Sequence, residues 1–145
     1  MTYLTFVVLL ETSLFTASPA PPANPLRYQE AYRQTAQTGQ PLLVLVGAQW
    51  CAACERMKAS VMPDLNRRGR LHQVTYAMVD QDTEQKLAAR LMSGATVPQL
   101  ILFTKTADGW TRRQLTGMHS SRDVQAFLHN AIERTAARPQ EKVRR

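Results

Sequence analysis

The sequence predicts a single α/β domain in which helices cover both faces of a small mixed sheet. Apolar runs at 41–47, 73–80 and 98–104 alternate with segments of helical periodicity. A chain of 145 residues, 44% hydrophobic and 20% charged, can bury one core and has ordinary globular composition. The expected order of elements is α-β-α-β-α-β-β-α.

The first twenty-five residues differ in composition from the rest. An apolar run without Lys or Arg before Arg27 leads into a Pro- and Ala-rich stretch. Residues 1–20 resemble a secretory signal peptide or N-terminal membrane anchor, and 21–25 a linker, although Glu11 interrupts the apolar run. We therefore expect a periplasmic or otherwise extracytoplasmic protein. The alternative is a cytoplasmic protein with an irregular N-terminus.

The first helix is predicted over 26–39 and the first strand over 41–47. Gly39 and Pro41 end the helix, whereas the strand is apolar throughout, as expected when both faces are buried. The residues expected to face inward from the helix are Leu26, Tyr28, Ala31, Tyr32 and Thr35.

A second helix is predicted from Cys51 to Met62, where Pro63 breaks or restarts it. The strand 73–80 follows, and then a helix over 82–94. We expect that helix to begin with a cap from Asp82 or Thr83 and to end at Gly94. Its inward residues are Leu87, Leu91 and Met92.

The remaining elements are the strands 98–104 and 110–117 and a closing helix capped by Ser120 or Ser121. Because helices join the first three strands, we expect these to be parallel, and the short turn makes the fourth antiparallel to the third. The domain is expected to cover 26–136, followed by a basic tail, 137–145. The apolar stripe of the closing helix is Val124, Phe127, Leu128, Ala131 and Ile132.

The net charge of +7 is spread along the chain, without a nucleic-acid recognition motif. A solvated basic surface is the favoured interpretation, and no nucleic-acid partner is expected. No glycine-rich phosphate loop is present, so no nucleotide cofactor is expected. The sequence contains no dimerisation element, and a monomer is expected.

The only two cysteines, Cys51 and Cys54, lie where a buried strand leads into a helix. The unpaired N–H groups at a helix start lower the pKa of a cysteine thiol and favour thiolate. A disulfide across so short a loop removes little chain entropy, which argues against a purely structural bond. A zinc site is the less favoured alternative, because it needs four ligands and the remaining nitrogen donors, His72, His119 and His129, show no paired spacing in the sequence. Inert buried cysteines are the other alternative; reversible redox chemistry is favoured.

Two motifs make the chain resemble the thioredoxin superfamily: "WCAAC" at the strand-to-helix turn and "TVPQLILF" about 45 residues later. The resemblance implies a thioredoxin-like fold with a cis proline at Pro98 beside the cysteines. It implies that the backbone of Val97 pairs with an extended substrate. It also implies contact surfaces at Trp50 and Gly117, for which core packing and an ordinary turn are the alternatives.

Some positions depart from the pattern of cytosolic thioredoxin. Ala52 and Ala53 stand between the cysteines in place of Gly-Pro, and the buried Asp and Lys of that family correspond to Leu45 and about Tyr76. The acceptor of the Cys54 proton is therefore open between water and Glu55. The pattern around the motifs is similar to extracytoplasmic thioredoxin-like proteins, including the C-terminal domain of the bacterial transmembrane thiol reductant conductor.

These observations predict a thiol-disulfide oxidoreductase that reduces or isomerises protein disulfides through Cys51 and Cys54, without metal or cofactor. Its expected partners are disulfide-bearing or dithiol proteins and a second thiol system. An oxidant is the less favoured variant. The alternatives are a thioredoxin-fold peptide-binding or chaperone module that does not cycle, and a metal chaperone that uses the two thiolates.

Overall fold

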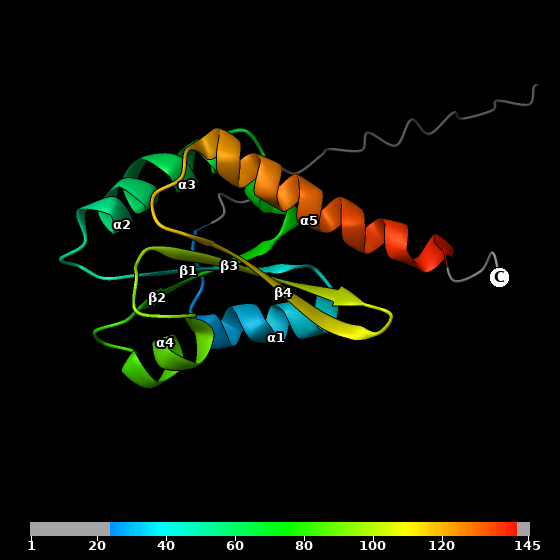
Figure 1. The fold of residues 1–145 in the computed structure, drawn as a ribbon, viewed down its shortest axis with the longest axis horizontal. Coiled ribbons are helices and arrows are strands. Elements are labelled where there is room, and N and C mark those ends of the chain that lie inside the picture. The colour runs from blue at the N-terminus through cyan, green and yellow to red at the C-terminus, as the bar shows by residue number, and fades with distance from the viewer. Residues whose placement is uncertain (1–23, 142–145) are drawn as a thin grey trace, which may run out of the picture.

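The computed structural model describes residues 24–141, with side chains as far as residue 134 (Figure 1). The predicted signal peptide, most of the linker and the last four residues of the predicted tail lie outside this range. The elements are α1 (Tyr28–Thr38), β1 (Leu42–Gly47), α2 (Ala52–Arg56), the π-helical turn η1 (Met57–Val61), α3 (Met62–Arg67), the 3₁₀ turn η2 (Leu71–Gln73), β2 (Thr75–Asp80), α4 (Gln85–Leu91), β3 (Gln99–Thr106), β4 (Gly109–Thr116) and α5 (Ser121–Glu141). Their order is the predicted one.

The four strands form one mixed sheet in the order β2-β1-β3-β4. β1 and β2 are parallel, and β3 and β4 are antiparallel, as predicted. The prediction that β3 runs parallel to the first two strands is wrong, because β3 is antiparallel to β1. Gln99, the first residue of β3, pairs with Val46 near the end of β1.

The short connection through α4 explains the direction of β3. Gly47 at the end of β1 pairs with Asp80 at the end of β2, so β2 ends at the same edge of the sheet where β3 begins. α4 has seven residues, about 10 Å of helix, whereas a six-residue strand is about 20 Å long. The helix therefore turns the chain at that edge without carrying it back across the sheet.

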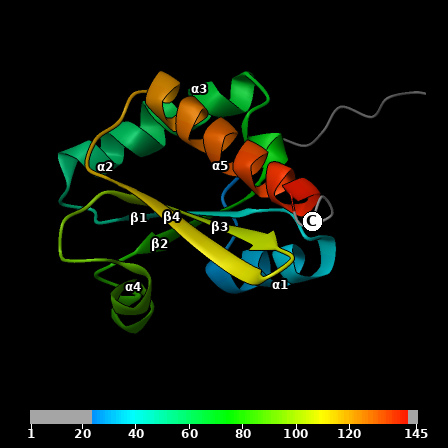
Figure 2. The same cartoon turned by 45° about the vertical axis from the view of Figure 1, so that its right-hand side comes forward.

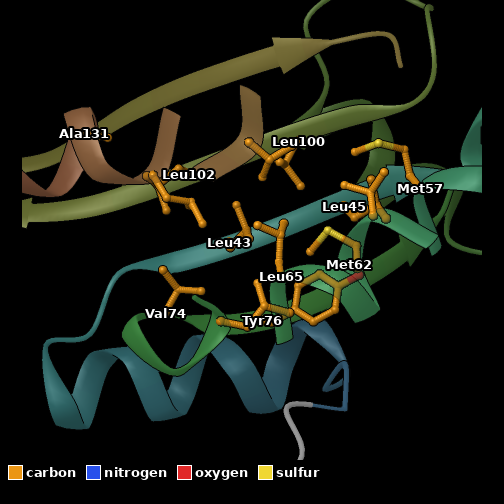
Figure 3. Packing of buried hydrophobic residues seen from close by; sticks show 14 residues of the cluster. Leu43, Leu45, Met57, Met62, Leu65, Val74, Tyr76, Leu100, Leu102 and Ala131 are labelled. Carbon is orange, nitrogen blue, oxygen red and sulfur yellow. The ribbon is translucent and has the colours of Figure 1, made fainter. Parts of the chain in front are cut away.

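Helices cover both faces of the sheet, as predicted (Figures 1 and 2). α2, α3 and α5 lie on one face, and α1 and α4 on the other. Each face has its own apolar cluster, and the buried strand β1 contributes alternate residues to both. Figure 3 shows the first cluster, in which Leu43, Leu45, Leu100 and Leu102 of the sheet pack with Met57, Met62 and Leu65 of the helical layer.

The helical run that follows Cys51 continues past Pro63 to Arg67. Pro63 cannot donate a backbone hydrogen bond, and in a regular helix its ring would clash with the carbonyl four residues earlier. A wider turn accommodates it, since the Met62 N–H bonds to the Met57 carbonyl five residues before it. The proline restarts the helix, which is one of the two predicted outcomes.

Several predicted element ends differ in the structure. Leu26 precedes α1 and forms a parallel bridge with Ala77 at the edge of β2. The N-cap residue of α4 is Glu84, and the C-cap is Met92, so the predicted caps of this helix are wrong. The predicted cap residues Asp82 and Thr83 instead donate their N–H groups to the Asp80 carboxylate, and Gly94 lies two residues beyond the C-cap.

The start of α5 agrees with the sequence. The Ser120 hydroxyl accepts the Asp123 N–H, and the Asp123 carboxylate accepts the Ser120 N–H and O–H. These bonds form a reciprocal N-terminal cap and hold the pKa of Asp123 below its usual value. Val124, Leu128 and Ala131 are buried, and Phe127 and Ile132 pack against the same cluster. The apolar stripe of this helix was therefore predicted correctly.

We expect Tyr76→Phe to stabilise the protein by about 1 kcal/mol. The Tyr76 hydroxyl is buried, and within the described residues it makes no hydrogen bond. Burial also raises the pKa of Tyr76 above its ordinary value of 10.0. The free energy of unfolding of the wild type is therefore unaffected by Tyr76 ionisation below pH 10.0. It falls above that pH, because Tyr76 ionises in the unfolded chain before it ionises in the folded protein. Urea unfolding at neutral and alkaline pH should show the gain growing as pH rises; a less stable phenylalanine variant would contradict this prediction.

Candidate active site

Cys51 and Cys54 form a disulfide at the start of the helical run that follows β1. Their Cα atoms lie 5.2 Å apart. Cys51 is the N-cap residue, and its sulfur accepts the Cys54 N–H at 3.1 Å. The sulfur of Cys51 therefore occupies the end of the helix where N–H groups stabilise negative charge, as the sequence predicts.

The two sulfurs differ in accessibility. Cys51 is 7% exposed, whereas Cys54 is fully buried. Both lie in a small apolar cluster with Ala48, against which Ala53 and Val97 pack. Attack from outside can therefore reach Cys51 first, and Cys54 can act only within the protein. The two cysteines thus differ in how far a molecule outside the protein can reach them.

Val97 packs against the cluster that contains the disulfide, and the peptide bond between Val97 and Pro98 is cis. The Gly117 N–H, just after β4, donates to the Pro98 carbonyl at 2.8 Å. Gly117 has a φ of 91°, a conformation that glycine adopts without steric cost. The fold thus places Val97 against the cysteine cluster and joins Gly117, from a separate part of the chain, to the adjoining Pro98.

Trp50 is 68% exposed although it precedes the buried Cys51. Packing in the core, one explanation for this tryptophan, does not account for so open a position. Met118, directly after Gly117, is also exposed, at 40%. The residue before Cys51 and the residue after Gly117 are therefore both large apolar side chains that are open to solvent.

Gln99 organises the loop before Pro98. Its side chain is completely buried and accepts the Ser93 N–H while donating to the carbonyls of Ser93 and Thr96. These three bonds satisfy the buried amide and tether residues 93–96 to β3. Sequence reasoning gave Gln99 no role. The only local sequence feature that indicates a structural role for Gln99 is its position directly after a proline and before an apolar run.

The two positions that correspond to the buried Asp and Lys of cytosolic thioredoxin lie in apolar surroundings here. Leu45 is fully buried, and Tyr76 is 5% exposed, in the same cluster (Figure 3). Charged groups occur instead on the helix beside Cys54, where Lys58 pairs with Glu55 at 3.0 Å. Sequence reasoning considered Glu55 as a proton acceptor and placed Lys58, one helical turn beyond Cys54, on a related helix face, but gave Lys58 no chemical role.

Gly47 allows the cysteine helix to approach β1 closely. A Cβ atom at this position would lie 3.1 Å from Cys54 Cβ, 3.3 Å from Cys54 Sγ and 3.9 Å from Lys58 Cε. The absence of a side chain therefore leaves the space that Cys54 occupies and places the Lys58 stem alongside it. The sequence marked Gly47 only as the end of a strand.

Within residues 24–141, the His, Cys, Asp and Glu side chains form no group of three that could hold a metal ion. In the same part of the chain, no helix has both the length and the apolar character of a membrane span.

A family model described as a thioredoxin-like domain matches residues 28–132, and the chain belongs to this family. No match was found among curated protein sequences. The fold is also similar to that of solved thioredoxins. A thioredoxin from Thermus thermophilus is 22% identical, with a TM-score of 0.64 over 77% of this chain and 88% of that one.

Two further structures show the same likeness. The Trx4 domain of ERdj5 is 19% identical, with a TM-score of 0.63 over 78% of this chain and 98% of that one. Trxlp from Edwardsiella tarda is 25% identical, with a TM-score of 0.55 over 72% and 95% of the two chains. The predicted superfamily and fold are confirmed, and the close cysteine pair indicates a thiol-disulfide redox protein in general terms.

Proposed function

We propose that this protein reduces or isomerises disulfides in other proteins by cycling the Cys51–Cys54 pair between dithiol and disulfide. The observation that carries the proposal is the bond between a slightly exposed and a fully buried cysteine at a helix start. Helix N–H groups stabilise the thiolate that leaves or attacks at Cys51. Val97 and Pro98 offer backbone beside it, along which an extended substrate segment would lie.

The reaction has two exchange steps. The Cys51 thiolate attacks a substrate disulfide, forms a mixed disulfide and releases one substrate thiolate, which takes a proton from solvent. The Cys54 thiolate then attacks the Cys51 sulfur, so that the Cys51–Cys54 bond forms and the second substrate thiolate leaves. Two electrons have passed to the substrate, and an external dithiol must return them to the pair.

Ala52 and Ala53 support a reductant over an oxidant. Neither side chain can donate a hydrogen bond to the Cys51 thiolate, so neither adds to the stability of the reduced form. The N-terminal composition and the likeness of the motif region to extracytoplasmic thioredoxin-like proteins support a place outside the cytoplasm. The partners we propose are disulfide-bearing proteins and a dithiol donor, with the protein acting as a monomer.

A second candidate is a peptide-binding or chaperone module in which the cysteines do not cycle. The exposed Trp50 and Met118 favour it, because both could contact a peptide without any redox step. The two candidates differ in whether the disulfide opens and closes reversibly.

The reduction potential of the Cys51–Cys54 couple tests the proposal. The full-length protein is equilibrated with glutathione or dithiothreitol buffers, and the free thiols are trapped and counted by mass. We expect a reversible two-electron transition near the potential of thioredoxin, about −270 mV. A value near −120 mV would make the protein an oxidant. If no reversible transition occurs, the binding module replaces the redox protein as the better explanation.

A further inference from the structure

Cys54 presents an electrostatic problem that the exchange chemistry must solve. Its side chain is fully buried in a cluster of Ala48, Cys51, Ala53 and Val97, none of which carries a charge. Resolution of the mixed disulfide nevertheless requires the Cys54 thiolate. Desolvation disfavours a buried anion unless a cation or hydrogen-bond donors compensate for it.

Lys58 is positioned to compensate for this charge. It lies one helical turn after Cys54. A Cβ atom placed at Gly47 would lie 3.3 Å from Cys54 Sγ and 3.9 Å from Lys58 Cε. Both side chains therefore cover the same backbone position of β1. The Lys58 side chain is 23% exposed, so its ammonium lies at the margin of the protein, where its field is only partly screened.

The other charged groups around Cys54 have different surroundings. The Glu55 carboxylate forms an ion pair with Lys58, with 3.0 Å between Glu55 Oε1 and Lys58 Nζ, and the Glu55 side chain is 55% exposed. Asp80 is in register with Gly47 on β2, and its carboxylate accepts the N–H groups of Asp82 and Thr83. The residues of β1 and of the Val97 loop that pack on Cys54 are uncharged. Lys58 is thus a cation whose side chain faces the same glycine as Cys54, and Glu55 reduces its effect.

We propose that Lys58 is a positioning residue for the resolving step: its ammonium stabilises the Cys54 thiolate, and Glu55 holds and partly neutralises that ammonium. The proposal rests on the proposed function, since it concerns the second exchange step of the same cysteine pair. In that step the Cys54 electron pair forms the bond to Cys51 Sγ while the Cys51–substrate bond breaks. The proton that Cys54 has lost beforehand passes to solvent.

The test measures the ionised fraction of Cys54 directly. In a Cys51→Ser background, thiolate absorbance in the ultraviolet is followed against pH, with the double cysteine variant as a blank. We expect Lys58→Met to lower the thiolate fraction at a fixed pH about tenfold. Glu55→Gln should raise it, because the ammonium then acts without its partner, and Lys58→Arg should retain most of the wild-type fraction.

Lys105→Met is the matched control, since it removes one exposed lysine from β3, on another part of the sheet. It should leave the thiolate fraction unchanged, and circular dichroism checks that each variant is folded. An unchanged fraction in Lys58→Met, or an equal fall in Lys105→Met, would overturn the proposal for Lys58. The reduction potential of the wild-type protein distinguishes failure of the Lys58 proposal from failure of the proposed redox function. If the wild-type cysteine pair cycles reversibly while Lys58→Met leaves the thiolate fraction unchanged, only the role of Lys58 is refuted.

Discussion

A Cys54→Ser variant is expected to lose turnover completely and to accumulate as a covalent adduct with its substrate. Cys51 remains able to attack, because it is the more exposed of the two cysteines, at 7%, and is the helix N-cap residue. Serine cannot resolve the mixed disulfide, so the reaction stops after the first exchange. Reduction of insulin measures turnover, and electrophoresis without reductant followed by mass measurement detects the adduct, which dithiothreitol should release.

Cys51→Ser is the matched control for this trap. Here the remaining thiol, Cys54, is fully buried, and we expect neither turnover nor adduct. The contrast depends on the difference in exposure between two cysteines that are otherwise neighbours. Adducts on Cys51→Ser at the same rate as on Cys54→Ser would show that the roles of nucleophile and resolving thiol have been assigned wrongly.

Leu45→Asp is expected to lower the free energy of unfolding by about 3–5 kcal/mol at neutral pH. The substitution places the carboxyl of cytosolic thioredoxin at its corresponding position, but the neighbours here are apolar, and Tyr76 supplies no positive charge. Desolvation would raise the folded-state pKa of the introduced carboxyl above its unfolded value of about 3.9. The variant should therefore be less impaired below about pH 4 and lose stability as pH rises.

Leu45→Asn separates the two causes of this loss. It has nearly the same shape as the aspartate variant but does not ionise, so it should be destabilised without the dependence on pH. Urea unfolding of both variants across acidic and neutral pH measures the difference. An aspartate variant as stable as the wild type at neutral pH would show that a cation reaches this position, and our description of the site as apolar would be wrong.

Much of the fold follows from local patterns along the chain. The uniformly apolar run of β1 indicated a strand buried on both faces, and the apolar stripe of α5 identified the side that packs on the sheet. The cysteine pair could also be placed at a strand-to-helix junction, because an apolar run and a helical segment meet there. Each of these inferences depends on residues close together in the sequence.

Local patterns were thus sufficient to predict the element order, the superfamily and the position of the cysteine pair. Three features became evident only from the folded chain: β3 is antiparallel to β1, Gln99 tethers the loop before Pro98, and Gly47 faces both Cys54 and the Lys58 stem. The physical reason is that periodicity and capping are short-range properties. Strand direction and the packing of a helix on a strand depend instead on contacts between segments that are distant in the chain, which local patterns do not contain.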